Sequence, residues 1–115
     1  MNFLMRIIIT SIVAFGLSYL LTGIQFDTFW TAIIVSIVLA VLNAIIKPIL
    51  ILLTLPITLL TFGLFLFVIN ALIILLAEKL VTGFSVDGFW WALLFSLLLS
   101  LLTSLLYQEK KEKKG

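Results

Sequence analysis

The sequence lacks two residue types that carry much of protein chemistry. Of its 115 residues none is cysteine and none is histidine. Their absence excludes disulfides, thiol catalysis and cysteine metal sites, together with the usual general base and the commonest transition-metal ligand. The sequence also contains no pair of acids, no serine beside a base, no phosphate-binding glycine loop and no metal cluster. We therefore expect neither an enzyme nor a protein with a metal or other cofactor.

Charge is scarce as well. Charged residues make up 10% of the chain and hydrophobic residues 64%, whereas a soluble domain carries about 25% charged residues. This balance predicts an integral membrane protein, with one membrane domain over residues 1–115 and the lipid bilayer as its surroundings. The net charge of +2 comes mostly from a lysine-rich tail, residues 108–115. Such a tail is typical of a topology anchor, and we expect no nucleic-acid partner.

Four apolar stretches are long enough to cross a bilayer, which takes about 20 residues. They cover residues 3–22, 28–46, 63–81 and 88–107, approximately. The first could be mistaken for a signal peptide, but it continues to Leu21 without a break, and we expect it to be retained. The predicted fold is all-α, an integral membrane four-helix bundle.

The two halves of the chain resemble each other. The stretch from Thr22 to Trp30 returns as Thr82 to Trp90, with Thr-Gly, Asp and Phe-Trp at matching places. Each copy lies in a short polar gap between two apolar runs, which indicates two tandem helix–loop–helix hairpin repeats. Asp27 and Asp87 are expected to cap the helices that follow, and the glycine of each copy is expected to end the helix before it.

Positive charge predicts the orientation. Arg6, Lys47 and the tail fall on one side of the four-span arrangement, and an excess of Lys and Arg marks the cytoplasmic side. We therefore expect a multi-pass protein with both termini in the cytoplasm. Glu78 and Lys79, near the outer end of the third span, are interpreted as a local ion pair or surface anchor.

Residues 47–62 are the least regular part of the chain. They are mostly apolar, too few for a span, and contain Pro48 and Pro56. This length favours a re-entrant or interfacial segment, with a helix starting at Pro48 and broken at Pro56. The alternative is one long, kinked second helix that runs to about Leu55.

Polar side chains form stripes along the predicted helices, because they recur three or four residues apart. The stripes comprise Ser36, Ala40, Asn43 and Lys47; Ser96, Ser100, Thr103 and Tyr107; and Asn70 with Glu78. Such stripes usually form hydrogen bonds between helices inside a bundle. The other interpretation is a polar pathway assembled from several copies. No charged residue lies near the centre of a span, which argues against ion-coupled transport.

Two motifs carry a resemblance to a known family. They are Asn-x-x-x-Lys-Pro at residues 43–48 and Leu-Pro-x-Thr-Leu-Leu-Thr at residues 55–61. With the segments around Asn70 and Asp87, they make residues 3–107 resemble the bacterial four-helix phage-holin-like membrane family, also called the mycobacterial four-span phage holin family. The resemblance implies a four-span protein of the bacterial cytoplasmic (inner) membrane. Holins accumulate there and open lesions that release a cell-wall-degrading enzyme. The resemblance brings no catalytic residues.

Two functions follow as expectations. The first is a holin-like protein that permeabilises the cytoplasmic membrane as a homo-oligomer, since four helices cannot enclose a wide aqueous hole. The alternative is a non-lytic structural or envelope-stress protein that binds lipids or a membrane protein partner. Basic groups beside the apolar segment 47–62 would attract anionic lipid, at about 1 kcal/mol each. Solute transport by a dimer is disfavoured, because the two repeats share one topology.

Overall fold

The computed structural model describes the backbone of residues 2–114 and the side chains of residues 2–107. Its elements in chain order are α1 (Phe3–Leu20), β1 (Ile24–Phe26), α2 (Phe29–Leu53), α3 (Leu55–Leu60), α4 (Phe65–Leu80), β2 (Phe84–Val86) and α5 (Phe89–Lys114). Over the described residues, three helical stretches are long and apolar enough to cross a membrane: α1, α2 and the part of α5 up to Tyr107. The expected third span corresponds to α4, whose 16 residues fall short of the usual 20 or so.

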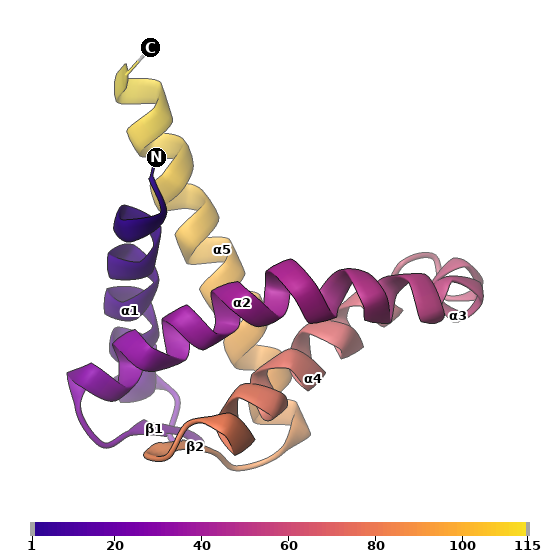
Figure 1. Ribbon diagram of the computed structural model, residues 1–115, viewed down its shortest axis with the longest axis horizontal. Helices are drawn as coiled ribbons and strands as arrows, with labels where there is room; N and C mark the ends of the chain where they lie inside the picture. The colour runs from indigo at the N-terminus through magenta and orange to yellow at the C-terminus, as the bar shows by residue number, and fades with distance from the viewer. Residues whose placement is uncertain (1, 115) are drawn as a thin grey trace.

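The long helices form two pairs that meet at one end and diverge at the other. Helix α1 packs beside α5, and α2 packs beside α4. Both pairs start from the two short strands, and Figure 1 shows them spreading apart from there, with α3 at the tip of the α2–α4 pair. We call the end with the strands the ribbon end. The start of α1 lies beside α5 at the opposite end of the α1–α5 pair, and α5 continues beyond it (Figure 1). We call this end the termini end.

The two loops expected to be simple connections pair with each other as an antiparallel ribbon. Gln25 lies opposite Ser85. The amide of Asp27 donates to the carbonyl of Gly83 at 2.9 Å, and the amide of Asp87 donates to the carbonyl of Gly23 at 2.9 Å. These two bonds join positions that correspond in the two halves of the sequence. The chain is mostly helical, as expected, and the ribbon is an addition that the sequence analysis did not foresee: the polar gaps satisfy their backbone groups by pairing with each other.

The core lies beneath the ribbon. The rings of Phe26 and Phe84 stack with centroids 4.9 Å apart, and both lie close to the ring of Phe95. Phe95 is completely buried, as are Ile24 and Val35. Apolar strand residues therefore cover the place where the helices converge, and this end of the molecule is closely packed.

Helix α2 does not end before Lys47 as the sequence analysis favoured. It continues through Pro48 to Leu53, which agrees with the alternative of one long second helix. Proline removes a single backbone donor inside a helix. Any helix end leaves four carbonyl groups without intrahelical partners, which is costly among apolar surroundings. At the observed end the amide and the hydroxyl of Thr54 both donate to the Leu50 carbonyl.

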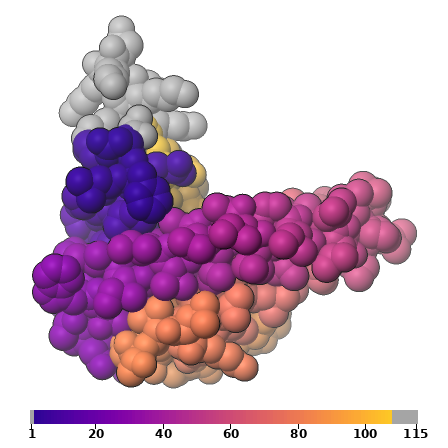
Figure 2. Space-filling view, in the orientation of Figure 1, coloured from indigo at the N-terminus to yellow at the C-terminus, as the bar shows by residue number. Residues whose placement is uncertain are grey.

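Threonines and one proline shape the turn between α2 and α4. The Thr54 hydroxyl donates to the Leu50 carbonyl at 2.7 Å, and Pro56 stands in the first turn of α3, where its missing donor is tolerated. Thr61 accepts the Phe65 amide at 3.2 Å at the start of α4. The hydroxyl of Thr58 is buried and has no hydrogen-bond partner among the residues whose side chains the structure describes. Figure 2 shows that this end projects well beyond the rest of the molecule.

The expected helix caps are wrong in detail. Helix α2 begins after Thr28, whose hydroxyl accepts the amide of Thr31 at 3.3 Å. Helix α5 begins at Phe89, directly after Gly88. The two aspartates therefore lie one position too early to cap the helices. Their backbone amides belong to the ribbon instead.

Candidate functional site

A polar cleft opens where the helix pairs diverge. It has a volume of about 450 Å³ and is lined by α1, α2 and α5 at the termini end. Its polar lining consists of Arg6, Thr10, Ser36, Asn43, Ser100, Thr103 and Tyr107. Apolar side chains such as Phe3 and Leu39 complete the walls. Helix α2 leaves the ribbon in a different direction from α1 and α5 (Figure 1). The three helices therefore move apart with distance from the ribbon, and the cleft lies between them.

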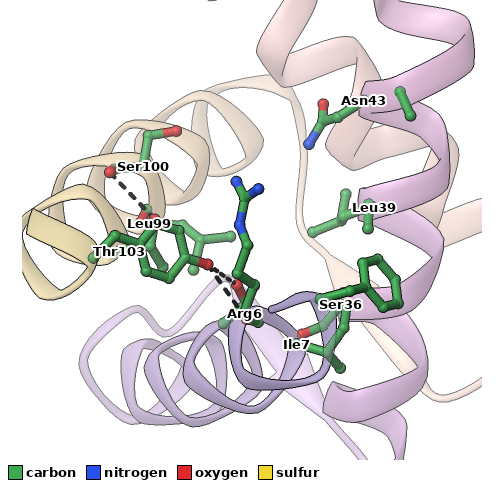
Figure 3. A pocket seen from close by; sticks show the side chains of 13 residues that line it. Arg6, Ile7, Ser36, Leu39, Asn43, Leu99, Ser100 and Thr103 are labelled. Atoms are coloured by element: carbon green, nitrogen blue, oxygen red, sulfur yellow. Dashed lines mark hydrogen bonds between the residues drawn. The ribbon is translucent and has the colours of Figure 1, made fainter. Parts of the chain in front are cut away.

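The side chain of Arg6 extends into this cleft, which we call the Arg6 cleft. Figure 3 shows its guanidinium pointing away from α1 and toward Asn43 on the facing wall. The guanidinium carbon lies 5.1 Å from the centroid of the Tyr107 ring, within the range of a cation–π interaction. Arg6 is otherwise exposed. The cleft thus contains a positive charge held against an aromatic ring.

Tyr107 is fixed by two hydrogen bonds to α1. Its hydroxyl lies 2.8 Å from the Thr10 hydroxyl and donates to the backbone carbonyl of Arg6 at 3.3 Å. These contacts join α5 to α1 at the termini end, where the core beneath the ribbon no longer holds the helices together. They also set the position of the ring against which the guanidinium rests.

Two hydrogen-bonded serines, Ser11 and Ser36, join α1 to α2 at the bottom of the cleft. The Ser11 hydroxyl donates to the Ser36 hydroxyl at 3.1 Å, which links α1 to α2. Ser36 in turn donates to the Ala32 carbonyl at 2.9 Å, and both serines are buried. On α5, Thr103 donates to the Leu99 carbonyl at 2.7 Å. The hydroxyls of Ser11, Ser36 and Thr103 thus bond to neighbouring helix groups. Within residues 2–107, the polar side chains of the cleft left to meet a ligand are Arg6, Asn43 and Ser100.

A second, smaller hollow of about 60 Å³ lies between α2, α4 and α5. Its polar lining is Asn43, Lys47, Asn70, Ser96 and Ser100. Asn43 and Ser100 also line the Arg6 cleft, so the two hollows adjoin. The predicted stripes of α2, α4 and α5 therefore do face a common interior region.

The remaining predicted residues lie elsewhere. Asp27 and Asp87 flank the ribbon, and Glu78 is bonded to it: its Oε2 accepts the Val86 amide at 2.9 Å. Pro48 borders a shallow depression with Lys47 on the outer part of α2, and Pro56 belongs to α3. These positions shape the fold but do not line the Arg6 cleft.

Sequence reasoning missed the main charged group of the cleft. Arg6 was interpreted only as an orientation signal, and Thr10 was not considered. The two residues are four positions apart and thus share a face of α1, which was a usable signal. What the sequence could not indicate is that this face meets Tyr107 from the far end of the chain.

The fold and the composition of its surface define an α-helical membrane protein. Comparison with family models identifies the family of the chain: residues 1–105 match the family described as mycobacterial 4 TMS phage holin, superfamily IV. The chain belongs to this family. The resemblance noted from the two proline motifs is thereby confirmed.

Two relatives are uncharacterized. The chain is 44% identical over 79 residues to the uncharacterized membrane protein YvlD of Bacillus subtilis (strain 168), a match that covers 68% of this chain and 66% of the relative. It is 46% identical over 77 residues to an uncharacterized protein of Streptomyces coelicolor, covering 64% of this chain and 62% of the relative. The matches thus span slightly less than two thirds of either relative's length. No solved structure matches the chain.

Proposed function

We propose that this chain is a non-lytic component of the bacterial cytoplasmic membrane that holds the polar head of a membrane lipid in the Arg6 cleft. The observation that carries the proposal is the cleft itself: polar groups from three helices converge on one hollow. The outer faces of the same helices are apolar, with Ile12, Ile34 and Leu101 all exposed. Hydroxyl stripes alone are usual in helix packing, but this cleft also contains the charged side chain of Arg6, and an ionisable group within a membrane-spanning helix is a candidate functional group.

Charge supports the orientation that this function needs. Arg6 and Lys47 lie toward the diverging ends of the helices, whereas the three carboxylates of residues 2–107 lie at or near the ribbon. By the positive-inside rule the termini are cytoplasmic and the ribbon faces outward. The cleft then opens toward the cytoplasmic leaflet, whose anionic lipids attract basic groups. We also interpret the two halves as copies of one unit, which the matching hydrogen bonds of the ribbon support.

The direction of the polar side chains favours this function over lesion formation. Ser36, Asn43 and Ser100 face the interior of a single chain. A water-filled hole between copies needs polar groups on the outer surface, and the exposed residues Ile37, Val41 and Ile45 of α2 are apolar. Lipid binding requires only the cleft that one chain already forms.

Permeabilisation by a homo-oligomer is the second candidate, and the open side of the cleft favours it. Several copies with their clefts turned toward one another could enclose water. A timed expression experiment with a membrane-potential dye, with and without a co-expressed endolysin, separates the two functions. We expect a steady potential at full membrane expression. Sudden collapse of the potential, with lysis only beside the endolysin, would instead establish the lesion.

Filling the cleft tests lipid binding directly. Ala40 lines the cleft, and its neighbour Val41 is 48% exposed on the outside of α2. We expect Ala40→Phe to lower the amount of lipid that survives purification and is detected by native mass spectrometry, because the ring occupies the hollow. The matched variant Val41→Phe should retain lipid like the parent chain. Equal retention by both variants would contradict the proposal.

A further inference from the structure

The guanidinium of Arg6 lacks a hydrogen-bond acceptor in the part of the chain that the structure describes. Its one recorded side-chain contact there is the Tyr107 ring. The carboxylates of residues 2–107 are Asp27, Glu78 and Asp87, and none of them lines the cleft. Among residues 2–107, nothing therefore occupies the five N–H groups of this arginine, and they can donate to a ligand.

The Arg6 guanidinium is placed to meet an anion. Arg6 is exposed and lies near the start of α1, a helix with the length and hydropathy of a membrane span, and long basic side chains near helix ends extend to the membrane interface. The contact with the Tyr107 ring positions the guanidinium without using its hydrogen-bond donors. Figure 3 shows the Arg6 side chain extended from α1 into the cleft, with the planar fork of the guanidinium at its tip. That fork fits the oxygens of a phosphate group in a bidentate manner.

Asn43 supplies a second donor from the opposite wall. It lies on α2, is exposed to the cleft, and has no recorded side-chain hydrogen bond within residues 2–107. Its amide can donate two hydrogen bonds. Lys47, one turn further along α2, lines the adjoining hollow together with Asn43. A ligand between Arg6 and Asn43 would thus meet donors from two sides and a second positive charge nearby.

We propose that the Arg6 cleft recognises the phosphate group of an anionic membrane phospholipid. Arg6 pairs with the two non-bridging phosphate oxygens and Asn43 donates to one of the same two oxygens, while the apolar walls at Phe3 and Leu39 receive the first carbons of the lipid chains. Tyr107 is a positioning residue that keeps the guanidinium extended. This inference rests on the proposed lipid-binding function and adds the chemistry that selects the lipid.

The test compares two lipids in nanodiscs and after detergent exchange, with native mass spectrometry as the readout. One lipid is phosphatidylglycerol and the other is diacylglycerol, which has the same chains without phosphate. We expect Arg6→Gln to lower phosphatidylglycerol retention about tenfold, as for the loss of a hydrogen-bonded charge. Diacylglycerol retention should be unchanged. Lys79→Gln is the matched control, because it removes one positive charge from an exposed site near the ribbon.

A variant on the other wall guards against a folding defect. Asn43→Leu leaves α1 and α5 untouched, and it should also lower phosphatidylglycerol retention selectively. Circular dichroism of each variant gives the helix content, and an unchanged spectrum confirms the fold. If both variants bind phosphatidylglycerol as the parent chain does, the phosphate assignment is wrong although lipid binding stands. If neither lipid is retained by the parent chain, the proposed function fails as well.

Inorganic phosphate distinguishes the source of the anion. Added to the protein in neutral detergent, it should compete weakly with phosphatidylglycerol and should not raise the melting temperature by itself. Strong stabilisation by inorganic phosphate alone, lost in Arg6→Gln, would overturn the lipid assignment and identify a site for free phosphate.

Discussion

At the scale of single residues, the two glycines of the matching loops serve different purposes. Gly83 has φ +96°, a left-handed conformation that glycine adopts readily. It lies in the turn before β2, two residues beyond Val81, which ends α4 in an extended conformation, so the expected role as the residue that ends the helix is wrong. Gly23 is needed for space instead. A Cβ on Gly23 would overlap the ring of Trp91, so the backbone of the first loop lies directly against an aromatic side chain of α5.

Replacing Gly23 therefore tests the packing of the first loop on α5. We expect Gly23→Ala to destabilise the protein by about 1–3 kcal/mol, the usual range for overpacking, because the ring or the ribbon has to move. Gly16→Ala is the control, since a Cβ there meets nothing within 4 Å and alanine is more favourable than glycine inside a helix, by about 1 kcal/mol. Thermal unfolding in detergent measures both. Equal melting temperatures would show that Trp91 does not rest on Gly23.

At the scale of elements, the ribbon joins the two halves of the chain at the end where the helices converge, in addition to the packing of α1 on α5 and of α2 on α4. Each strand has only three residues and could not persist alone. Its partners come from the other half, and the Glu78 carboxylate adds a hydrogen bond to Val86 at 2.9 Å. The ribbon thereby fixes where the helix pairs start to diverge, and so where the cleft lies.

A disulfide across the ribbon checks this pairing. Gln25 lies opposite Ser85, both are exposed, and the chain has no cysteine of its own. We expect the double variant Q25C/S85C to form an intramolecular disulfide on mild oxidation, because opposed strand residues lie within the required distance. The pair Q25C/T82C places one cysteine out of register and should cross-link poorly. Similar yields from the two pairs would contradict the ribbon.

The helices were predictable from the sequence to a useful degree, whereas their junctions were not. Long apolar runs locate α1, α2 and α5, because little else satisfies backbone groups in lipid. The continuation of α2 through Pro48 was weighed only as the alternative, since proline usually ends a helix in water. The ribbon was missed although Ile24-Gln25-Phe26 alternates in polarity as strands do. Three residues are too short a pattern to indicate pairing.

The polar stripes that line the candidate site could be predicted from the sequence, whereas its charged residue, Arg6, was not recognised as part of the site. Spacing along each helix correctly placed Ser36, Asn43 and Ser100 on faces that meet in one cleft. Arg6 escaped because its partner in space, Tyr107, is separated from it by almost the whole chain. Local spacing describes one helix face, but a site between helices depends on the direction in which each pair leaves the ribbon.

At the scale of the whole molecule, the distribution of charge and the shape are consistent with the same orientation in the membrane. The molecule measures 38 × 37 × 24 Å, and its two helix pairs both lead away from the ribbon (Figure 1). If the ribbon faces outward, the termini and α3 both approach the cytoplasmic side. This orientation brings Arg6 to the depth at which the phosphates of the cytoplasmic leaflet lie.

Cysteine labelling in cells tests the orientation. Ser85 is exposed on the ribbon, and Leu60 at the end of α3 is 80% exposed. We expect a membrane-impermeant maleimide to label Ser85→Cys in intact spheroplasts and Leu60→Cys only after the membrane is opened. The reverse pattern would invert the orientation and turn the Arg6 cleft toward the outer leaflet.

The symmetry of the ribbon bears on how such a chain could arise. Ile24 pairs with Val86 and Phe26 with Phe84, so each strand meets its counterpart through matching positions in opposite order. A separate hairpin of α1, β1 and α2 would be able to pair its strand with the same strand of a second copy. Fusion of two such genes requires no new interface. Each half is then free to diverge, as Thr103 and Tyr107 at the positions matching Asn43 and Lys47 illustrate.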